Sequence, residues 1–235
     1  MNLAVTTALM IVAGYLFGCA PYGVLVGALH GVDVTAAGSR NIGATNVGRL
    51  LGRKWGIIVF VLDVLKGGVP TLLATIVFDD WCVAGQISPV VARLGGLAVG
   101  FAAVLGHNYS VLLRFRGGRG VATSLGVCLG FFPDLTVPAL VAFAVWGVVV
   151  AVSRYVSLAS VTAAGVFPFL VAGWSLARGR RLIQDDCPLV AFAVLVGLLV
   201  IYRHRANLRR LAAGTEHKIG AREEAGWASA SGDRA

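Results

Sequence analysis

Long apolar runs without charges alternate along the chain with short polar loops. A helix needs about 20 apolar residues to cross a hydrocarbon core of ~30 Å. The pattern predicts an all-α polytopic membrane helix bundle with seven transmembrane helices, at residues 3–29, 55–78, 94–113, 121–133, 135–152, 155–177 and 187–202. Six spans is the alternative, because the fourth run is short enough to be a re-entrant segment and the seventh is also marginal in length.

Composition supports an integral membrane protein. Apolar residues make up 57% of the 235 residues and charged residues only 13%, whereas a soluble domain carries about 25% charged residues. We expect residues 1–220 to form one integral membrane domain. The end of the chain, residues 221–235, is rich in Ala, Gly and Ser with mixed charges, and is predicted to be a disordered cytoplasmic tail.

The distribution of basic residues orients the predicted bundle. A seven-span topology places most of the 20 Lys and Arg residues on one side, in segments 30–54, 114–119, 153–154 and 203–235. Cytoplasmic loops are enriched in Lys and Arg, so the N-terminus is predicted outside and the C-terminus in the cytoplasm. The residues that disagree with this orientation are Arg178, Arg180 and Arg181.

The net charge of +9 fits anionic lipid, phosphorylated substrates or nucleic acid. Because the basic residues sit in loops between apolar runs, lipid and phosphorylated substrates are favoured and no nucleic-acid partner is expected. The four cysteines show neither CxxC spacing nor a Cys/His cluster, so no metal site is predicted. Cys82 and Cys187 both fall at the predicted outer face, as inert thiols or as a disulfide.

The first predicted cytoplasmic loop is rich in glycine, hydroxyl and amide side chains. Successive backbone N–H groups in such a loop can form an anion-binding concavity, and glycine lets the backbone approach a ligand closely. The candidate contacts to a phosphate group are Ser39, Asn41, Gly43, Thr45, Asn46 and Arg49. An ordinary turn with a helix cap explains the same composition equally well.

The second loop interleaves arginine with glycine, as RFRGGRG at residues 114–120, directly before an apolar run. Cationic side chains, a flexible backbone and a helix N-terminus together suit a phosphate group. The spacing is not that of a P-loop. A cytoplasmic anchor that contacts lipid headgroups is the alternative. Candidate ligand contacts here are Arg116, Gly118, Arg119 and Thr123.

Further polar residues follow the last run and interrupt the second. His204 and Asn207 share a helix face at i and i+3, so His204 is a candidate acid, base or hydrogen-bond donor; interfacial snorkelling is its alternative. Asp63 and Lys66 lie inside the second run, where ionisable groups are usually paired or functional. We favour a structural pair. Ser157 falls on the same side as the three loops.

Taken together, these segments resemble the bacterial membrane acyl-phosphate:glycerol-3-phosphate acyltransferase family. The resemblance runs in order over nearly the whole chain, to about residue 220. The matching motifs are Ser39-x-Asn41-x-Gly43-Ala44-Thr45-Asn46, Gly106-His107-Asn108-Tyr109 with Gly117-Gly118-x-Gly120-Val121-Ala122-Thr123, and Tyr202-Arg203-His204-Arg205-x-Asn207 with Gly214-x-Glu216-His217.

The resemblance implies an activity and its partners. The family transfers an acyl chain from acyl phosphate to the first (sn-1) hydroxyl of glycerol 3-phosphate, giving lysophosphatidate and inorganic phosphate, the first acylation in phospholipid synthesis. It implies seven spans in the inner (plasma) membrane, an active site facing the cytoplasm, no cofactor, contact with membrane lipid, and the acyl-phosphate-forming enzyme as a pathway neighbour. Because both substrates carry phosphate and the donor also carries an apolar acyl chain, a basic pocket should open onto an apolar groove.

The resemblance also implies roles for individual residues. The catalytic residues would be Ser39, His204 and Asn207. The substrate-binding residues would be Asn41, Gly43, Thr45, Asn46, Arg49, Arg116, Gly118, Arg119, Thr123 and Ser157. The donor's own phosphate is thought to serve as the base, with His204 as the alternative base and a covalent Ser39 acyl-enzyme also open.

This chain departs from the family pattern at three arginines. The family usually has Gly where this chain has Arg40, and Lys where it has Arg116 and Arg119. Arg keeps the charge of Lys but allows bidentate contacts to phosphate. Arg40 either supplies an extra cation or points toward lipid headgroups.

Two other functions are alternatives. No His is followed five residues later by Asp, which argues against acyltransferases that use a thioester donor and a His-x4-Asp pair. An organic-phosphate transporter or channel would also need basic loops. Such proteins usually bind substrate near the midplane, within repeats, whereas the polar groups here gather at one face.

Overall fold

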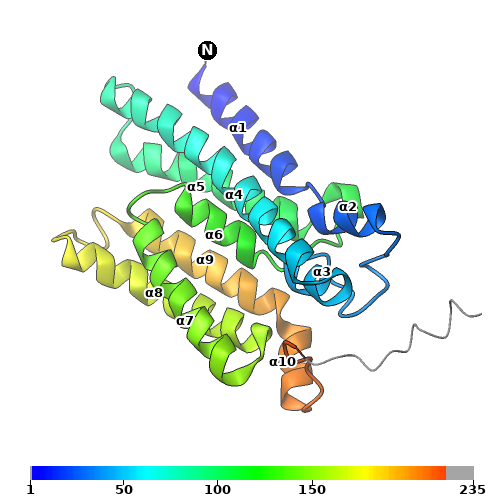
Figure 1. The fold of residues 1–235 in the computed structure, drawn as a ribbon. Coiled ribbons are helices and arrows are strands. Elements are labelled where there is room, and N and C mark those ends of the chain that lie inside the picture. The colour runs from blue at the N-terminus through cyan, green and yellow to red at the C-terminus, as the bar shows by residue number, and fades with distance from the viewer. Residues whose placement is uncertain (1, 221–235) are drawn as a thin grey trace, which may run out of the picture.

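The computed structural model describes residues 2–220, and these residues contain helices and no strand. The predicted tail at residues 221–235 lies outside the described residues. Figure 1 shows the helices, which are α1 (Leu3–Gly18), α2 (Tyr22–Leu29), α3 (Ala44–Leu51), α4 (Arg53–Val83), α5 (Pro89–Asn108), α6 (Val121–Leu129), α7 (Thr136–Ser153), α8 (Val156–Ala177), α9 (Cys187–Arg203) and α10 (Arg205–Ala212), with a 3-10 turn at Val111–Leu113.

The all-α membrane fold is confirmed for the described residues. Five helical segments in them are long and apolar enough to cross a membrane, and a sixth is added if the bent pair of α9 and α10 is one span. α6 has nine residues and is about 13.5 Å long at 1.5 Å per residue, well short of a hydrocarbon core. The seven-span count and the orientation therefore stay predictions.

α6 occupies the middle of the bundle. It packs against α4 and α5 on one side and against α7 on the other. α1 packs on α5, while α7, α8 and α9 follow one another along the opposite side, as Figure 1 shows. The short helices α2, α3 and α10 gather at one end of the bundle, and the N-terminus lies at the other end.

Glycines let these helices approach closely. A Cβ added at Gly126 of α6 would lie 1.9 Å from the carbonyl oxygen of Val64 on α4. A Cβ at Gly18 of α1 would lie 2.1 Å from the carbonyl oxygen of Ala103 on α5. Small residues are favoured between membrane helices because lipid supplies no hydrophobic force to drive association, so close backbone packing must do so.

Ion pairs fix the end of the bundle far from the three short helices. Asp186, at the start of α9, is fully buried and accepts hydrogen bonds from Arg93 Nη1 at 2.9 Å and from Ser175 Oγ at 2.6 Å. Asp134 pairs with Arg178 and with Arg180, the latter at 2.9 Å. These partners explain why arginines occur at the predicted outer face against the charge rule.

Two further expectations concern residues inside or beside the spans. Asp63 Oδ1 lies 2.6 Å from Lys66 Nζ, and Lys66 also donates to the carbonyl oxygen of Ala20 at 2.9 Å. This geometry fits the predicted structural pair. Cys82 and Cys187 are both free thiols, so the disulfide alternative is wrong for this structure.

Arg40 has a left-handed backbone, with φ of 55°, and its side chain is exposed. A residue other than glycine in this conformation is strained by about 1–3 kcal/mol, which gives a physical reason for the glycine that the family usually carries here.

The helix packing predicts that Gly126→Ala destabilises the protein, because the added Cβ has no space beside the Val64 carbonyl. Overpacking of this kind costs about 1–3 kcal/mol, so the unfolding temperature in detergent should fall by several degrees. The matched control is Gly147→Ala on α7, where a Cβ meets no atom within 4 Å and the unfolding temperature should not fall. Equal unfolding temperatures for the two variants would contradict this account of the α4–α6 contact.

The strained backbone predicts that Arg40→Gly stabilises the protein by about 0.5–2 kcal/mol, the relief of strain less the entropy cost of glycine. Thermal unfolding of the purified protein measures this difference. Arg40→Ala is the control, because it removes the same charge without relieving the backbone. A stabilisation of the same size in Arg40→Ala would assign the effect to charge instead of strain.

Candidate active site

A polar pocket of about 910 Å³, open to solvent at its mouth, lies at the end of the bundle that carries α3 and α10. Segments far apart in sequence meet there: the loop before α3, the glycine-rich loop before α6, the start of α8 and the break between α9 and α10. Most predicted site residues line it, namely Ser39, Asn41, Gly43, Thr45, Asn46, Arg49, Arg119, Ser157, His204 and Asn207.

The loop before α3 is ordered by two asparagines. Asn46 is buried and bonds the loop backbone, donating to the carbonyl oxygen of Val34 at 3.0 Å and accepting from the Ser39 N–H at 2.9 Å. Asn41 Oδ1 accepts from the Gly43 N–H at 2.8 Å. These contacts match the turn-and-cap alternative for both asparagines. They also hold the backbone of Ser39 at the pocket wall.

The glycine-rich loop is pressed against α5. A Cβ at Gly118 would lie 2.1 Å from Nε2 of the buried His107 ring. The Arg203 guanidinium donates to the carbonyl oxygens of Gly117 at 2.9 Å and Gly118 at 2.7 Å. The glycines therefore let the loop lie flat on α5, and Arg119 follows directly at the pocket wall.

Arg119 brings a half-buried positive charge into the pocket. Its side chain makes no hydrogen bond or ion pair with any residue in the described range 2–220. Burial lowers the pKa of Arg119 to about 10, against the attraction of Glu216 and with the repulsion of Arg210, Arg203 and Arg49. The guanidinium is still charged at neutral pH, so the pocket favours an anionic ligand.

The chain bends by 54° between α9 and α10, and His204 occupies the bend. His204 is buried, with Nδ1 2.8 Å from the carbonyl oxygen of Val200. Because a carbonyl oxygen can only accept, Nδ1 carries the proton. The other nitrogen, Nε2, is then the acceptor that a neutral His204 can offer to a ligand hydroxyl.

Glu216 ties the segment after α10 to the pocket. It accepts from Asn207 Nδ2 at 2.6 Å and from Arg210 Nε at 2.8 Å. Burial would raise the pKa of Glu216, but these hydrogen bonds hold it below its usual value. The same segment is anchored at Ile219, whose N–H donates to the carbonyl oxygen of Arg154 at 2.8 Å.

The Ser157 hydroxyl, at the start of α8, lies in the wall near Glu216. It is buried and has no hydrogen-bond partner of normal geometry among residues 2–220. In the same described range, no group of three His, Cys, Asp or Glu side chains is placed to hold a metal ion.

Arg116, Gly118 and Thr123, which the sequence also suggested as substrate contacts, do not line the pocket. Arg116 is exposed. Gly118 faces His107 instead of the cavity. Thr123 is buried against α4. A Cβ added at Gly67 of α4 would lie 2.2 Å from the carbonyl oxygen of Thr123.

Other lining residues were not among the predicted site residues. Those with polar or aromatic side chains are Phe60, Asp63, His107, Trp146, Ser160, Arg210, Glu216 and His217. Glu216 and His217 stood in a matching motif but were given no role. Asp63 was assigned only a structural role, although its position inside an apolar run was a signal. Phe60, Trp146 and Ser160 carried no signal, because aromatic and hydroxyl residues are common in apolar helices.

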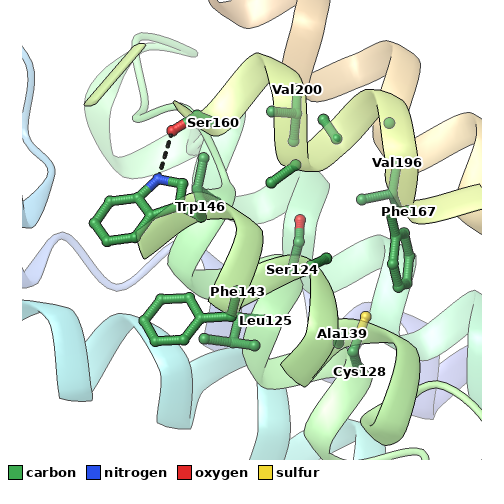
Figure 2. Close-up of a pocket in the computed structure, with 15 residues that line it drawn as sticks. Ser124, Leu125, Cys128, Ala139, Phe143, Trp146, Ser160, Phe167, Val196 and Val200 are labelled. Carbon is green, nitrogen blue, oxygen red and sulfur yellow. Dashed lines mark hydrogen bonds between the residues drawn. The ribbon is translucent and has the colours of Figure 1, made fainter. Parts of the chain in front are cut away.

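An apolar pocket adjoins the polar one and is open to its surroundings; its empty volume of about 540 Å³ includes part of that open space. It lies between α6, α7, α8 and α9, and Figure 2 shows the side chains that line it. Val121, Trp146 and Ser160 line both pockets. A ligand with a phosphorylated head and an apolar chain could therefore place each part in a matching environment.

Comparison with known proteins identifies the family of this chain. A family described as glycerol-3-phosphate acyltransferase matches residues 8–214. A relative of that name from Thermus thermophilus is 46% identical over 228 residues, which cover 96% of this chain and 100% of the relative. Another from Geotalea daltonii is 43% identical over 209 residues, covering 88% of this chain and 95% of the relative.

Two solved structures of PlsY, an integral membrane glycerol 3-phosphate acyltransferase, are also similar. The glycerol 3-phosphate form has 37% identity and a TM-score of 0.74, covering 92% of this chain and 96% of that one. The lysophosphatidic acid form has the same identity and coverage, with a TM-score of 0.73. The match over most of both chains, in sequence and in fold, shows that this chain belongs to the glycerol-3-phosphate acyltransferase family.

Proposed function

We propose that this acyltransferase takes its acyl chain from an acyl phosphate and transfers it to the sn-1 hydroxyl of glycerol 3-phosphate. The observation that carries the proposal is the junction of a basic polar pocket with an apolar one at Val121, Trp146 and Ser160. The polar pocket suits the phosphates of both substrates, and the apolar pocket suits the alkyl chain of the donor. The related PlsY structures in glycerol 3-phosphate and lysophosphatidic acid forms support the acceptor and the product.

The proposed reaction needs little covalent chemistry from the protein. The sn-1 oxygen attacks the carbonyl carbon of the mixed anhydride, and the bond between that carbon and the phosphate oxygen breaks. The hydroxyl proton passes to the departing phosphate, giving lysophosphatidate and inorganic phosphate. Positioning and charge stabilisation then supply most of the rate enhancement.

The arginines in the pocket are proposed to hold phosphate. Arg49 and Arg119 both line the cavity, and each charge-assisted contact is worth roughly 1.5–3 kcal/mol. Ser39, Thr45 and Ser157 are proposed hydrogen-bond donors to the phosphates or to the developing oxyanion. Asn46, with its bonds to the loop backbone, is proposed to position Ser39 instead of contacting substrate.

His204 and Asn207 are proposed to orient the acceptor. His204 Nε2 can accept the sn-1 hydroxyl, since Nδ1 is held by Val200. Asn207 is fixed by Glu216, which leaves its side-chain oxygen for a substrate hydroxyl. Their proximity in the cavity supports these roles.

The pocket is proposed to face the cytoplasm from the inner membrane. The basic residues of the chain concentrate at the end of the bundle that carries the pocket, as expected of a cytoplasmic face. The reaction is then the first acylation of phospholipid synthesis. An acyl-phosphate-forming enzyme must act before it.

The proposal predicts that purified protein in detergent releases inorganic phosphate from acyl phosphate only when glycerol 3-phosphate is present. Stoichiometric lysophosphatidate with the acyl group at the sn-1 position should appear, as measured by NMR of the product. The organic-phosphate transporter predicts no turnover under these conditions. Absence of turnover in well-folded protein, or acylation at another hydroxyl, would contradict the proposal.

The pocket electrostatics predict that Arg119→Ala raises the KM for a phosphate-bearing substrate by about ten- to hundredfold, from the loss of one charge-assisted contact. Steady-state kinetics with each substrate varied in turn measure the effect. Arg116→Ala is the matched control, because Arg116 lies in the same loop but is exposed and outside the pocket. Unchanged kinetics in a folded Arg119→Ala protein would remove Arg119 from the site.

A further inference from the structure

Trp146 stands at the boundary between the two pockets. It belongs to α7 and lines both cavities, together with Ser160 of α8 and Val121 of α6. On the polar side the wall includes Arg119 and Ser157, whereas on the apolar side it includes Phe143 and Leu125. A molecule that places a charged head in one pocket and a chain in the other passes the boundary that Trp146 forms with Ser160 and Val121.

The indole is held in one orientation. Its Nε1 donates to Ser160 Oγ at 3.2 Å, the bond drawn in Figure 2. Ser160 Oγ in turn donates to the carbonyl oxygen of Val156 at 2.8 Å. The indole also stacks on Phe143, with ring centroids 5.4 Å apart and an angle of 5° between the planes. Phe143 stacks on Phe60 of α4 at 6.1 Å. The hydrogen bond and the two ring stacks together restrict the orientation of the Trp146 side chain.

The apolar pocket extends from Trp146 along α6, α7 and α8, and the lining residues give its length. Its lining follows α6 from Val121 to Cys128, α7 from Ala139 to Trp146, and α8 from Ser160 to Phe167. Each stretch is a step of seven residues and rises about 10.5 Å. In Figure 2, Trp146 and Ser160 lie at one end, while Cys128 and Phe167 lie at the other. An extended alkyl chain advances about 1.3 Å per carbon for C–C bonds of about 1.5 Å, so about eight carbons fit.

We propose that Trp146, held by Ser160, is a specificity-determining residue for the acyl donor. It fixes the depth at which the chain leaves the polar pocket, so that the first eight or so carbons are recognised between α6, α7 and α8. The rest of a longer chain leaves the pocket toward lipid. This inference rests on the acyl-phosphate donor of the proposed function. It adds the residue that sets how far the acyl chain of that donor extends into the apolar pocket.

The test compares Trp146 variants by steady-state kinetics with butanoyl, hexanoyl and octanoyl phosphate, which remain soluble in water. In the wild type, each added methylene should lower the KM by up to about fourfold, the ratio expected for one buried CH2 group. Trp146→Ala should raise the KM for octanoyl phosphate about tenfold and flatten the dependence on chain length. The KM for glycerol 3-phosphate should stay within about twofold, because the substitution removes no proposed contact to that substrate. Loss of a full contact would change the KM about tenfold.

Milder variants keep the inference falsifiable if Trp146→Ala does not fold. Trp146→Phe keeps a ring but loses the N–H, and Ser160→Ala removes the acceptor of that N–H. Each should raise the KM for octanoyl phosphate about threefold, and the double variant should be no worse than either alone, because both remove one interaction. Trp174→Phe on α8, outside both pockets, is the control and should change nothing.

Two results would overturn the inference. One is an equal rise in KM for both substrates, which indicates a general structural effect. The other is an unchanged dependence on chain length in every Trp146 and Ser160 variant. Failure of the proposed function is distinguishable from both, because the wild type itself would then show no turnover of any acyl phosphate.

Discussion

The charge of Arg119 is the constraint on which the site depends. Its guanidinium is half-buried beside Arg49 and Arg210, and no residue of the described chain pairs with it directly. Removing a cation from water is costly unless a partner compensates, and clustered cations repel one another. A phosphate group of the substrate is the partner that we propose. The pocket therefore favours an anion, because Glu216 offsets only part of the positive charge of Arg49, Arg119 and Arg210.

The surrounding structure can be understood as support for this arrangement. Gly118 lets the loop lie against His107, and Arg203 holds the loop through its carbonyl oxygens. Glu216 is the carboxylate that moderates the cluster, pairing with Arg210 while fixing Asn207. Below the loop, Gly126 brings α6 against α4. The close packing of α6 against α4 thus supports the glycine-rich loop before α6, whose sequence alone would be flexible.

Much of the fold could be predicted because apolar runs have to become helices in lipid. Most helix boundaries follow the runs closely, with three exceptions. The first run is divided into α1 and α2, α5 spans Pro89–Asn108 instead of residues 94–113, and α4 continues past Phe78 to Val83. The fourth run became the nine-residue α6, since Gly130 and Pro133 end the helix early, and run length alone does not show this. The loops that carry the site were found from their glycine, hydroxyl and arginine content.

Other features needed the structure. Arg116 and Arg119 look alike in sequence, yet only Arg119 reaches the cavity, because the turn of the loop decides which side chain points inward. Asn46 looks like a ligand contact and is used to order the backbone. Trp146 and Ser160 are unremarkable in their helices. The role proposed for them depends on the contact between α7 and α8, which cannot be seen in the sequence of either helix alone.

The most direct test of the charge account is the thermal stabilisation of the protein by ligands. A ligand that binds only the folded state raises the unfolding temperature. The account predicts that glycerol 3-phosphate stabilises the wild type, that glycerol does not, and that the difference disappears in Arg119→Ala. Stabilisation of the Arg119→Ala protein by glycerol 3-phosphate to the same extent as the wild type would contradict it.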